Sequence, residues 1–178
     1  MMQCYVFDSV GTTVTNNYLD AIYDYHKKTS NDRGMLESLE RAGKDAREIM
    51  KSNSDLFHRI QRASIGGLES GLILVEIYPD VIKKFTRIKA NDGRVLIYSS
   101  GMLETLRLRY QRAGIANLID GYISPGGSDV KDERAFVHFV ETEIHAKGYE
   151  LDSFYDDSPS VMEWAVHTFP VVSQKQRA

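Results

Sequence analysis

Residues 3–13 read QCYVFDSVGTT, and they hold the most informative strand and turn of the chain. A β-prone, mostly apolar run from Gln3 to Phe7 stops at Asp8, and a turn that contains Gly11 follows. A short run of this kind, bounded by turn residues, is typical of a buried strand. The stretch therefore predicts a strand that delivers Asp8 to a polar loop at its carboxyl end.

Beyond residue 90, predicted strands alternate with predicted helices. This rhythm is typical of a doubly wound α/β fold, in which helices cover both faces of a mainly parallel sheet. The strands are expected over residues 94–98, 121–124, 153–155 and 170–173, and the helices over 102–113, 130–146 and 159–168.

A long helical region separates the first strand from this alternation. From residue 16 to about residue 64, apolar residues recur at helical spacing and no clear strand interrupts them. Gly66, Gly67 and Gly71 then predict a flexible stretch, which is either a plain loop or one of two hinge linkers between cap and core, the other lying around residues 13–15. We expect a core domain of residues 1–14 and 76–178, with a helical cap over residues 15–75 inserted after the first strand.

Length and charge limit the class of protein. The chain has 178 residues, which suits one core with an inserted sub-domain. Its formal net charge is −3 and no block of like charge stands out, so neither nucleic acid nor membrane is an expected partner. The apolar runs fall far short of the roughly 20 residues that span a bilayer, and the N-terminus lacks the basic segment of a signal peptide. We expect a cytoplasmic protein, and the sequence carries no signal for an oligomeric state.

Cysteine and histidine usage points away from redox and zinc chemistry. Cys4, the single cysteine, lies on the first predicted strand, and we interpret it as a packing residue that suits a reducing cytosol. His138 and His145 fall on one predicted helix, but the histidines show no paired spacing such as H-x-x-x-H. A zinc site is therefore not expected.

Polar side chains follow four successive predicted strands. In parallel α/β sheets, ligands bind outside the carboxyl ends of the strands, so these side chains are expected to meet at one edge. Each of them alone is an ordinary turn or capping residue. Together they are Asp8, Ser99, Ser100, Lys131, Asp156 and Asp157.

Such a cluster permits a specific chemistry. Two or three carboxylates at one place repel one another, so they stay ionised at neutral pH only beside a cation, and Mg²⁺ prefers oxygen ligands. A lysine and hydroxyl groups nearby hold the oxygens of a phosphoryl group. One carboxylate is then able to attack in line and form an aspartyl-phosphate intermediate.

Four strings of the chain resemble the four motifs of the haloacid dehalogenase-like (HAD) hydrolases: YVFDSVGTTV, VLIYSSG, the lysine in DVKDER, and FYDDSPSVMEWA. Within that superfamily the chain is most similar to the enolase-phosphatases of methionine salvage. The similarity lies in Asp8 followed by Gly11-Thr12-Thr13, and in the blocks IYPDV (Ile77 to Val81) and IYSSG (Ile97 to Gly101). The resemblance implies a HAD-type, Rossmann-like core with an inserted cap.

The resemblance also implies a role for each matched position in the first two motifs. Asp8 would be the nucleophile and a metal ligand, and the backbone carbonyl of Val10 would be a further ligand. Ser99 would bind the transferring phosphoryl group, with Ser100 and the Gly101 amide beside it.

The last two motifs would supply the charges. Lys131 matches the lysine that offsets charge between nucleophile and phosphate. Asp157 aligns with the acid that holds Mg²⁺, because Ala165, eight residues on, falls where that motif has a small helix residue. Asp156 is a candidate second ligand. The implied cofactor is Mg²⁺, and the implied partner is a small phosphorylated metabolite.

Val10 departs from the family pattern. Most HAD phosphatases have Asp at this position, and enolase-phosphatases have Glu. That acid protonates the leaving oxygen and later activates water, which is worth roughly 10²–10⁴-fold in rate. Val161, four residues after Asp157, likewise replaces a further acid of the fourth motif.

Three interpretations follow from Val10. The first is a working phosphatase with a slow or substituted acid step. The second is a phosphonatase-like C–P hydrolase, which needs a cap lysine that forms a Schiff base. The third is a non-catalytic relative that binds a phosphorylated ligand or a protein partner. Metal-free dehalogenase chemistry is disfavoured by the pair Asp156 and Asp157. The lysines of the predicted cap, none of them in a recognised motif, are Lys27, Lys28, Lys44 and Lys51.

The predicted cap also offers weaker candidates for substrate contact. Tyr18 is close enough in sequence to the Asp8 loop to affect specificity, although packing of the cap is its simpler role. Arg59 and Arg62 lie one turn apart on a predicted helix. They are candidates for binding a substrate anion, although a solvent-exposed helix face is their simpler role.

Overall fold

The computed structural model describes residues 2–41, 54–125 and 131–169, so the strand predicted over 170–173 lies outside the described residues. In the described part of the chain, four parallel strands form one sheet with the order β3-β2-β1-β4. The doubly wound α/β prediction is confirmed. The strands are β1 (Met2–Phe7), β2 (Arg94–Tyr98), β3 (Gly121–Ile123) and β4 (Tyr149–Tyr155).

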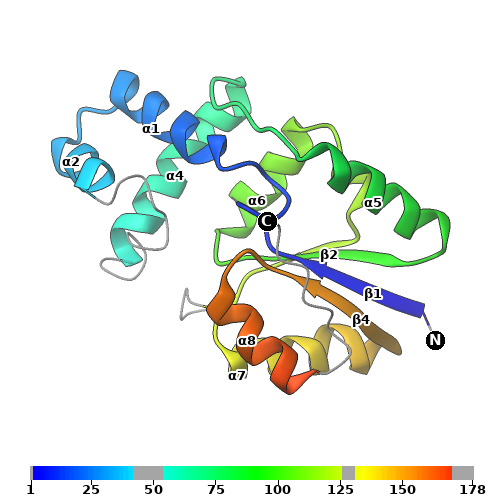
Figure 1. Cartoon of the computed structure of the whole chain (residues 1–178). Helices are drawn as coiled ribbons and strands as arrows, with labels where there is room; N and C mark the ends of the chain where they lie inside the picture. The colour runs from blue at the N-terminus through cyan, green and yellow to red at the C-terminus, as the bar shows by residue number, and fades with distance from the viewer. Residues whose placement is uncertain (1, 42–53, 126–130, 170–178) are drawn as a thin grey trace.

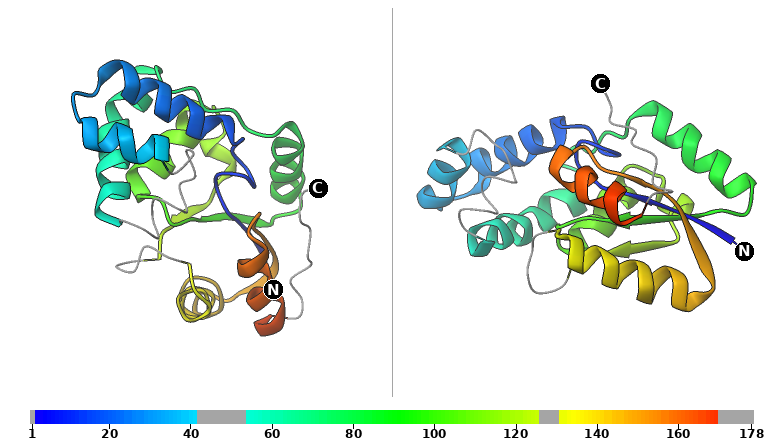
Figure 2. Two further views of the ribbon diagram at one scale, coloured as in Figure 1. Left: turned by 60° about the vertical axis from the view of Figure 1, so that its left-hand side comes forward. Right: turned by 60° about the horizontal axis from the view of Figure 1, so that its bottom comes forward.

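Helices cover both faces of the sheet (Figure 2). One face packs against α5 (Pro79–Ala90) and α6 (Leu103–Arg112), and the other packs against α7 (Glu133–Phe139) and α8 (Pro159–Thr168). Side chains alternate between these two cores along β1 and β2, since successive strand residues point to opposite faces. In β2, Ile97 packs on the α5 and α6 side while Leu96 packs on the α7 and α8 side. A strand buried on both faces explains the continuous apolar run.

Three described helices lie between β1 and α5 in sequence, and Figure 1 shows them beyond the carboxyl ends of the strands. They are α1 (Asn17–Thr29), α2 (Arg33–Arg41) and α4 (Ser54–Ser70). Helix α4 packs against both α6 of the core and α1. The helical character predicted for this region is therefore confirmed for the described residues, and α4 connects it to the core.

The flexible linker predicted at Gly66 and Gly67 is wrong. Both residues lie inside α4, where glycine serves close packing: a β-carbon on Gly67 would lie 2.7 Å from Cδ1 of Ile73 and 2.9 Å from Cε2 of Tyr25. The helix ends at Ser70, and Gly71 follows it with a φ of +75°, which side-chain-bearing residues rarely adopt. Of the three glycines predicted to form the flexible stretch, only Gly71 lies outside the helix.

The helix predicted over 130–146 is shorter and less regular than expected. It begins at Glu133, because the Asp132 carboxylate accepts a hydrogen bond from the Ala135 amide at 2.7 Å and caps the first turn. After Phe139 it widens into a π-helical turn, Val140–Ile144, before a last 3₁₀ turn. Lys131 therefore precedes the helix instead of beginning it.

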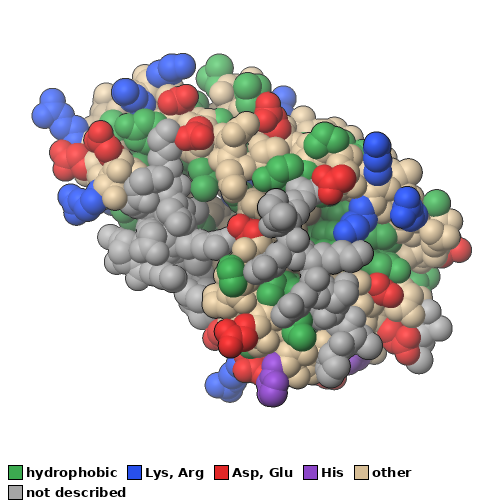
Figure 3. Space-filling view, in the orientation of Figure 1, with side chains coloured by type: hydrophobic (Ala, Val, Ile, Leu, Met, Phe, Trp, Pro, Cys, Tyr) green, Lys and Arg blue, Asp and Glu red, His purple; other side chains and the backbone are tan. Residues whose placement is uncertain are grey.

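No helix within the described ranges is both long and apolar enough to cross a bilayer. Acidic and basic side chains are interspersed on the face drawn in Figure 3. Cys4 is fully buried, and burial raises the pKa of its thiol to about 11, which makes it a packing residue rather than a reactive one.

Candidate active site

The loop after β1 folds tightly around one carbonyl group. The Ser9 carbonyl oxygen accepts hydrogen bonds from the amides of Thr13 and Val14 at 2.8 and 2.9 Å. The Thr13 hydroxyl donates to the carbonyl oxygens of Asp8 and Ser9, both at 3.0 Å. The Asp8 amide donates to the carbonyl of Tyr155 at 2.8 Å, which extends the pairing of β1 with β4 by one residue. These bonds fix the Asp8 backbone at the carboxyl edge of the sheet.

Lys131 bridges two buried carboxylates at this edge. Its Nζ lies 2.5 Å from Oδ1 of Asp8 and 2.5 Å from Oδ2 of Asp156. The three side chains expose 9%, 10% and 1% of their surface, so neither water nor salt screens this network effectively. Three residues that are far apart in sequence, and that were predicted to meet, are therefore in direct contact.

The electrostatics of this network set the protonation of its members. Burial raises the pKa of Asp8 to about 6, because it outweighs the opposing effect of the Lys131 ammonium. Burial alone would lower the pKa of Lys131, but the carboxylates of Asp8 and Asp156 more than offset this and raise it. Lys131 is therefore a permanent cation at neutral pH, able to hold an anion but not to accept a proton.

Asp157 completes a cluster of three carboxylates. One oxygen from each of Asp8, Asp156 and Asp157 lies within 4.8 Å of the others. Carboxylate oxygens are the ligands that Mg²⁺ prefers. The Asp157 carboxylate lies against Gly11, where a β-carbon would overlap it. The cluster thus offers the kind of donor atom that Mg²⁺ prefers.

The loop after β2 lies beside this cluster. Phe7 pairs with Ile97 in the β1–β2 ladder, so Asp8 and Ser99 leave neighbouring strands at nearly the same level. The Ser99 amide donates to the carbonyl of Ile123 at 3.1 Å, and both Ser99 and Gly101 are buried. Ser100, between them, is partly buried. The predicted phosphate-binding loop therefore starts next to the predicted nucleophile.

Comparison with known proteins gives partial sequence matches and extensive structural ones. The chain is 36% identical over 76 residues to the enolase-phosphatase E1 of Komagataella phaffii, and 39% identical over 57 residues to that of Naegleria gruberi. These matches cover 38% and 32% of this chain, but only 32% and 23% of those proteins. No family model matches the chain.

Two solved structures show how much of the fold is shared. The UTR4 protein of Saccharomyces cerevisiae superposes with a TM-score of 0.58 over 99% of this chain and 96% of its own, at 18% identity. The L-2-haloacid dehalogenase of Xanthobacter autotrophicus gives 0.59 over 94% and 74%, at 16% identity. The chain has the fold of the haloacid dehalogenase-like proteins. The similarity to enolase-phosphatases, which its motifs had indicated, is confirmed over part of its length.

Val10 occupies the position at which the HAD phosphatase motif that this loop resembles has an acid. Its side chain packs, partly buried, against the core that also contains Phe7 and Val14. The described residues place no His, Cys, Asp or Glu in the carboxylate cluster besides its three members. Asp156 is already engaged: one of its oxygens binds Lys131 and the other accepts from the Ser158 amide at 2.8 Å. Within this cluster, the described residues offer no substitute acid for Val10.

Sequence reasoning missed a polar network on the opposite side of the Asp8 loop. The buried Arg109 of α6 donates from Nη1 to the Ser9 hydroxyl oxygen at 3.2 Å. The Tyr110 hydroxyl bonds both Thr13 and Ser9. Gln61 of α4 accepts from the Met102 amide at 2.6 Å, at the start of α6. The sequence feature that indicates this network is Arg109 itself, because it is a charged residue on the apolar, buried face of the predicted helix.

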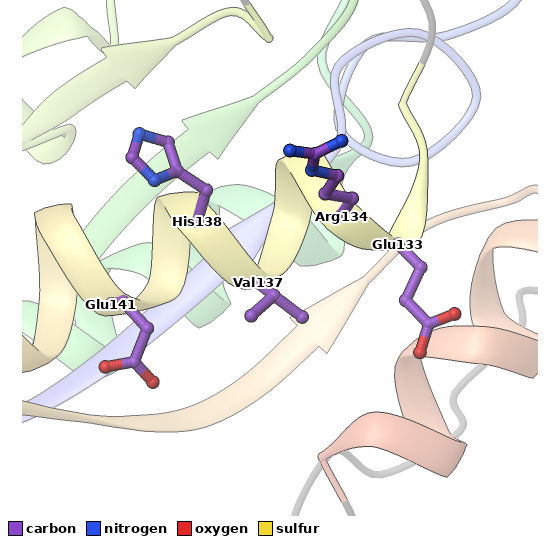
Figure 4. Close-up of a pocket in the computed structure, with 5 residues that line it drawn as sticks. All are labelled: Glu133, Arg134, Val137, His138 and Glu141. Carbon is purple, nitrogen blue, oxygen red and sulfur yellow. The ribbon is translucent and has the colours of Figure 1, made fainter.

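One surface pocket of the described residues is lined by none of the candidate site residues. It is a shallow surface hollow along α7, about 520 Å³ in volume. Figure 4 shows that its side chains leave one helix in several directions, with His138 and Glu141 on opposite sides. His145 of the neighbouring turn pairs with Glu141 at 3.1 Å at the protein surface. Arg59, a weaker candidate of the cap region, pairs with Asp32 at the exposed surface.

Proposed function

We propose that this HAD-like protein is a Mg²⁺-dependent phosphatase of a small phosphorylated metabolite, acting through an aspartyl-phosphate on Asp8. The observation that carries the proposal is the buried contact of Lys131 with Asp8 inside a cluster of three carboxylates. The partial similarity to enolase-phosphatases supports phosphate-ester chemistry. The buried single cysteine suits work in the cytoplasm.

Asp8 and Asp157 are the residues we propose as carboxylate ligands of Mg²⁺, with the Val10 carbonyl as a third ligand. Asp156 is the weaker candidate ligand, because Lys131 and the Ser158 amide already occupy its oxygens. When bound, Mg²⁺ neutralises the clustered negative charge and withdraws charge from the phosphoryl oxygens.

The chain's own groups then carry out attack and charge stabilisation. Asp8, held by its backbone bonds, attacks phosphorus with one carboxylate oxygen while the bond to the leaving oxygen breaks. Lys131 holds a phosphoryl oxygen, and the Ser99 hydroxyl binds another. Ser100 and the Gly101 amide complete this proposed cradle, which is strongest where water is excluded.

The inserted helices α1, α2 and α4 form the proposed cap. They lie beyond the carboxyl ends of the strands, where a cap would cover the Asp8 loop (Figure 1). Helix α4 contacts the start of α6 through Gln61, which ties the cap to the phosphate-binding loop. Specificity would then depend on residues of α1 and α4, since fold alone does not set the substrate.

Val10 favours a second candidate, a non-catalytic protein that binds a phosphorylated ligand. Its apolar side chain neither protonates a leaving group nor activates water, so the charged site would bind without turnover. The phosphonatase alternative receives no comparable support. Lys27 and Lys28 are exposed on α1, and Lys44 and Lys51 lie outside the described residues.

Phosphate release from p-nitrophenyl phosphate and from a panel of sugar, keto-acid and nucleotide phosphates tests the proposal. Each is assayed with Mg²⁺ and with EDTA, for the native chain and for Asp8→Asn. Release that needs Mg²⁺ and is lost in Asp8→Asn is expected. Binding of phosphate esters without release would instead support the non-catalytic candidate.

A further inference from the structure

Arg109 is a buried cation without a buried anion. It exposes only 4% of its surface, and its Nε is enclosed without a hydrogen-bond partner. No carboxylate in the described part of the chain forms an ion pair with it. A guanidinium carries five N–H donors, and the hydroxyl oxygen of Ser9 accepts from only one of its nitrogens. Burial of a charge is costly unless an opposite charge or several acceptors compensate for it.

The surroundings of Arg109 belong to the candidate active site. Ser9, which accepts its hydrogen bond, directly follows Asp8 in the chain. Its Nη2 lies 3.5 Å from the place where a β-carbon of Gly101 would stand, so the guanidinium also borders the proposed phosphate loop. The group therefore sits one residue from the nucleophile, on the side of the loop where α6 packs.

The inserted helices cover the guanidinium. The Tyr18 ring of α1 lies over it, with its centroid 4.4 Å from the guanidinium carbon, and the Tyr18 hydroxyl is buried without a partner. Gln61 of α4 borders Gly101 from the same side. Arg109 and Tyr18 stack on each other at the junction of cap and core, and the Arg109 Nε and the Tyr18 hydroxyl both lack a hydrogen-bond partner.

We propose that Arg109, with the Tyr18 hydroxyl, binds a second oxyanion of the substrate, a carboxylate or phosphate remote from the phosphoryl group that Asp8 attacks. The inference rests on the proposed function, because it assigns the far end of the same ligand. A guanidinium suits this task, since its planar fork binds a carboxylate or phosphate through two parallel hydrogen bonds. The oxyanion enters between α1 and α6 when the cap opens. The substrate class is then a metabolite with two anionic ends.

A purely structural role for Arg109 makes a different prediction. If the guanidinium served only to hold Ser9 and Tyr18 in place, its removal would destabilise the fold and would affect all ligands equally. If the guanidinium instead serves to bind an oxyanion, a variant with a neutral side chain of similar length should be at least as stable, because an uncompensated buried charge is removed. Only ligands with a second anionic end should then lose affinity.

The test measures the affinity of the native protein for matched phosphonates, whose C–P bond resists phosphatase action. Three phosphonates with a carboxylate at the other end are each compared with the alkylphosphonate of equal carbon number: phosphonoacetate, 3-phosphonopropionate and 4-phosphonobutyrate. In the same way, 1,3-propanediphosphonate tests a second group that resembles phosphate. Titration calorimetry in Mg²⁺ gives each dissociation constant. We expect at least one dianionic probe to bind about tenfold tighter than its singly ended partner. Whichever kind of probe binds more tightly, the carboxylate or the diphosphonate, identifies the second anionic group of the substrate.

Three variants assign the preference to this site. Arg109→Met should reduce the ratio of the two affinities to below twofold without lowering the unfolding temperature. Arg107→Met removes the same charge from an exposed position of α6 and should leave the ratio unchanged. Tyr18→Phe, which removes only the hydroxyl, should reduce the ratio partly. If Arg109→Met does not fold, Arg109→Lys should keep the charge but lose most of the preference.

The possible outcomes separate this inference from the proposed function. A ratio near one for every pair in the native protein overturns the inference, and so does a ratio that Arg109→Met and Arg107→Met lower equally. If the protein then still releases phosphate from esters that have only one anionic group, the proposed phosphatase function is retained. If the protein hydrolyses no phosphate ester but still binds dianionic probes more tightly through Arg109, the phosphatase proposal is overturned and the proposed oxyanion site is retained.

Discussion

The position that a β-carbon of Gly11 would take lies 2.3 Å from Oδ2 of Asp157 and 2.7 Å from its Cγ. Gly11 also has a φ of +88°, in the left-handed region that disfavours side chains. The loop after β1 and the loop after β4 therefore approach as closely as they do only because residue 11 has no side chain. This approach brings Asp157 next to Asp8, so the proposed metal site depends on a glycine that ligates nothing.

Gly11→Ala should abolish Mg²⁺ binding, because the added methyl group displaces the Asp157 carboxylate. We expect the rise in unfolding temperature that Mg²⁺ gives the native protein to disappear. Gly114→Ala is the matched control: its φ is +73° and no atom lies within 4 Å of the added β-carbon. Both variants lose about 1–2 kcal/mol from the unfavourable φ. Loss of the Mg²⁺ effect in both variants would contradict the proposed role of Gly11.

Lys131→Met should destabilise the fold strongly, because it leaves the buried carboxylates of Asp8 and Asp156 without their shared cation. Breaking a buried pair in this way costs about 3–5 kcal/mol. Lys89→Met, which breaks the more exposed pair with Asp120, should cost no more than about 1 kcal/mol. Urea unfolding at neutral pH in EDTA measures both values. Equal losses would show that the Lys131 network adds no more stability than a surface ion pair.

The meeting of Asp8, Lys131 and Asp157 was predictable from sequence because parallel topology requires it. Each follows a predicted strand, and the carboxyl ends of parallel strands share one edge of the sheet. Short apolar runs bounded by turn residues were enough to locate those strands. The doubly wound fold and this part of the candidate site therefore followed from local patterns.

The contacts of Arg109 and Gln61 were not predictable, because no local pattern encodes them. Arg109 meets Ser9 across 100 residues, and Gln61 reaches the Met102 amide across 41. The prediction of a flexible linker at Gly67 was wrong for another reason. Glycine permits either chain flexibility or close packing, and only the position of Ile73 in the fold decides between them. Side-chain packing between distant segments is the information that a single sequence lacks.

Ionisation of Asp8 should destabilise the metal-free protein as the pH rises. Its folded-state pKa, about 6, lies above the ordinary value of 3.8, so its contribution to stability is fully present below pH 3.8 and is lost as the pH rises through 6. A shift of this size corresponds to roughly 3 kcal/mol. The free energy of unfolding of the native chain, relative to Asp8→Asn, should therefore fall between pH 4 and pH 7. Urea unfolding in EDTA measures it, and a constant or rising difference would contradict the assigned protonation.

Val10→Asp should accelerate turnover, because it restores a proton-transfer group two residues after the nucleophile. For p-nitrophenyl phosphate the leaving group needs no proton, so the gain falls on hydrolysis of the aspartyl-phosphate and should reach about 10²-fold in kcat. Val10→Asn is the matched control, since it has the same shape but transfers no proton. Mass spectrometry of quenched reactions should show phosphorylated protein accumulating in the native chain and in Val10→Asn, and little in Val10→Asp. Equal rates for the Asp and Asn variants would mean that another step, such as opening of the proposed cap, limits turnover instead of the absent acid.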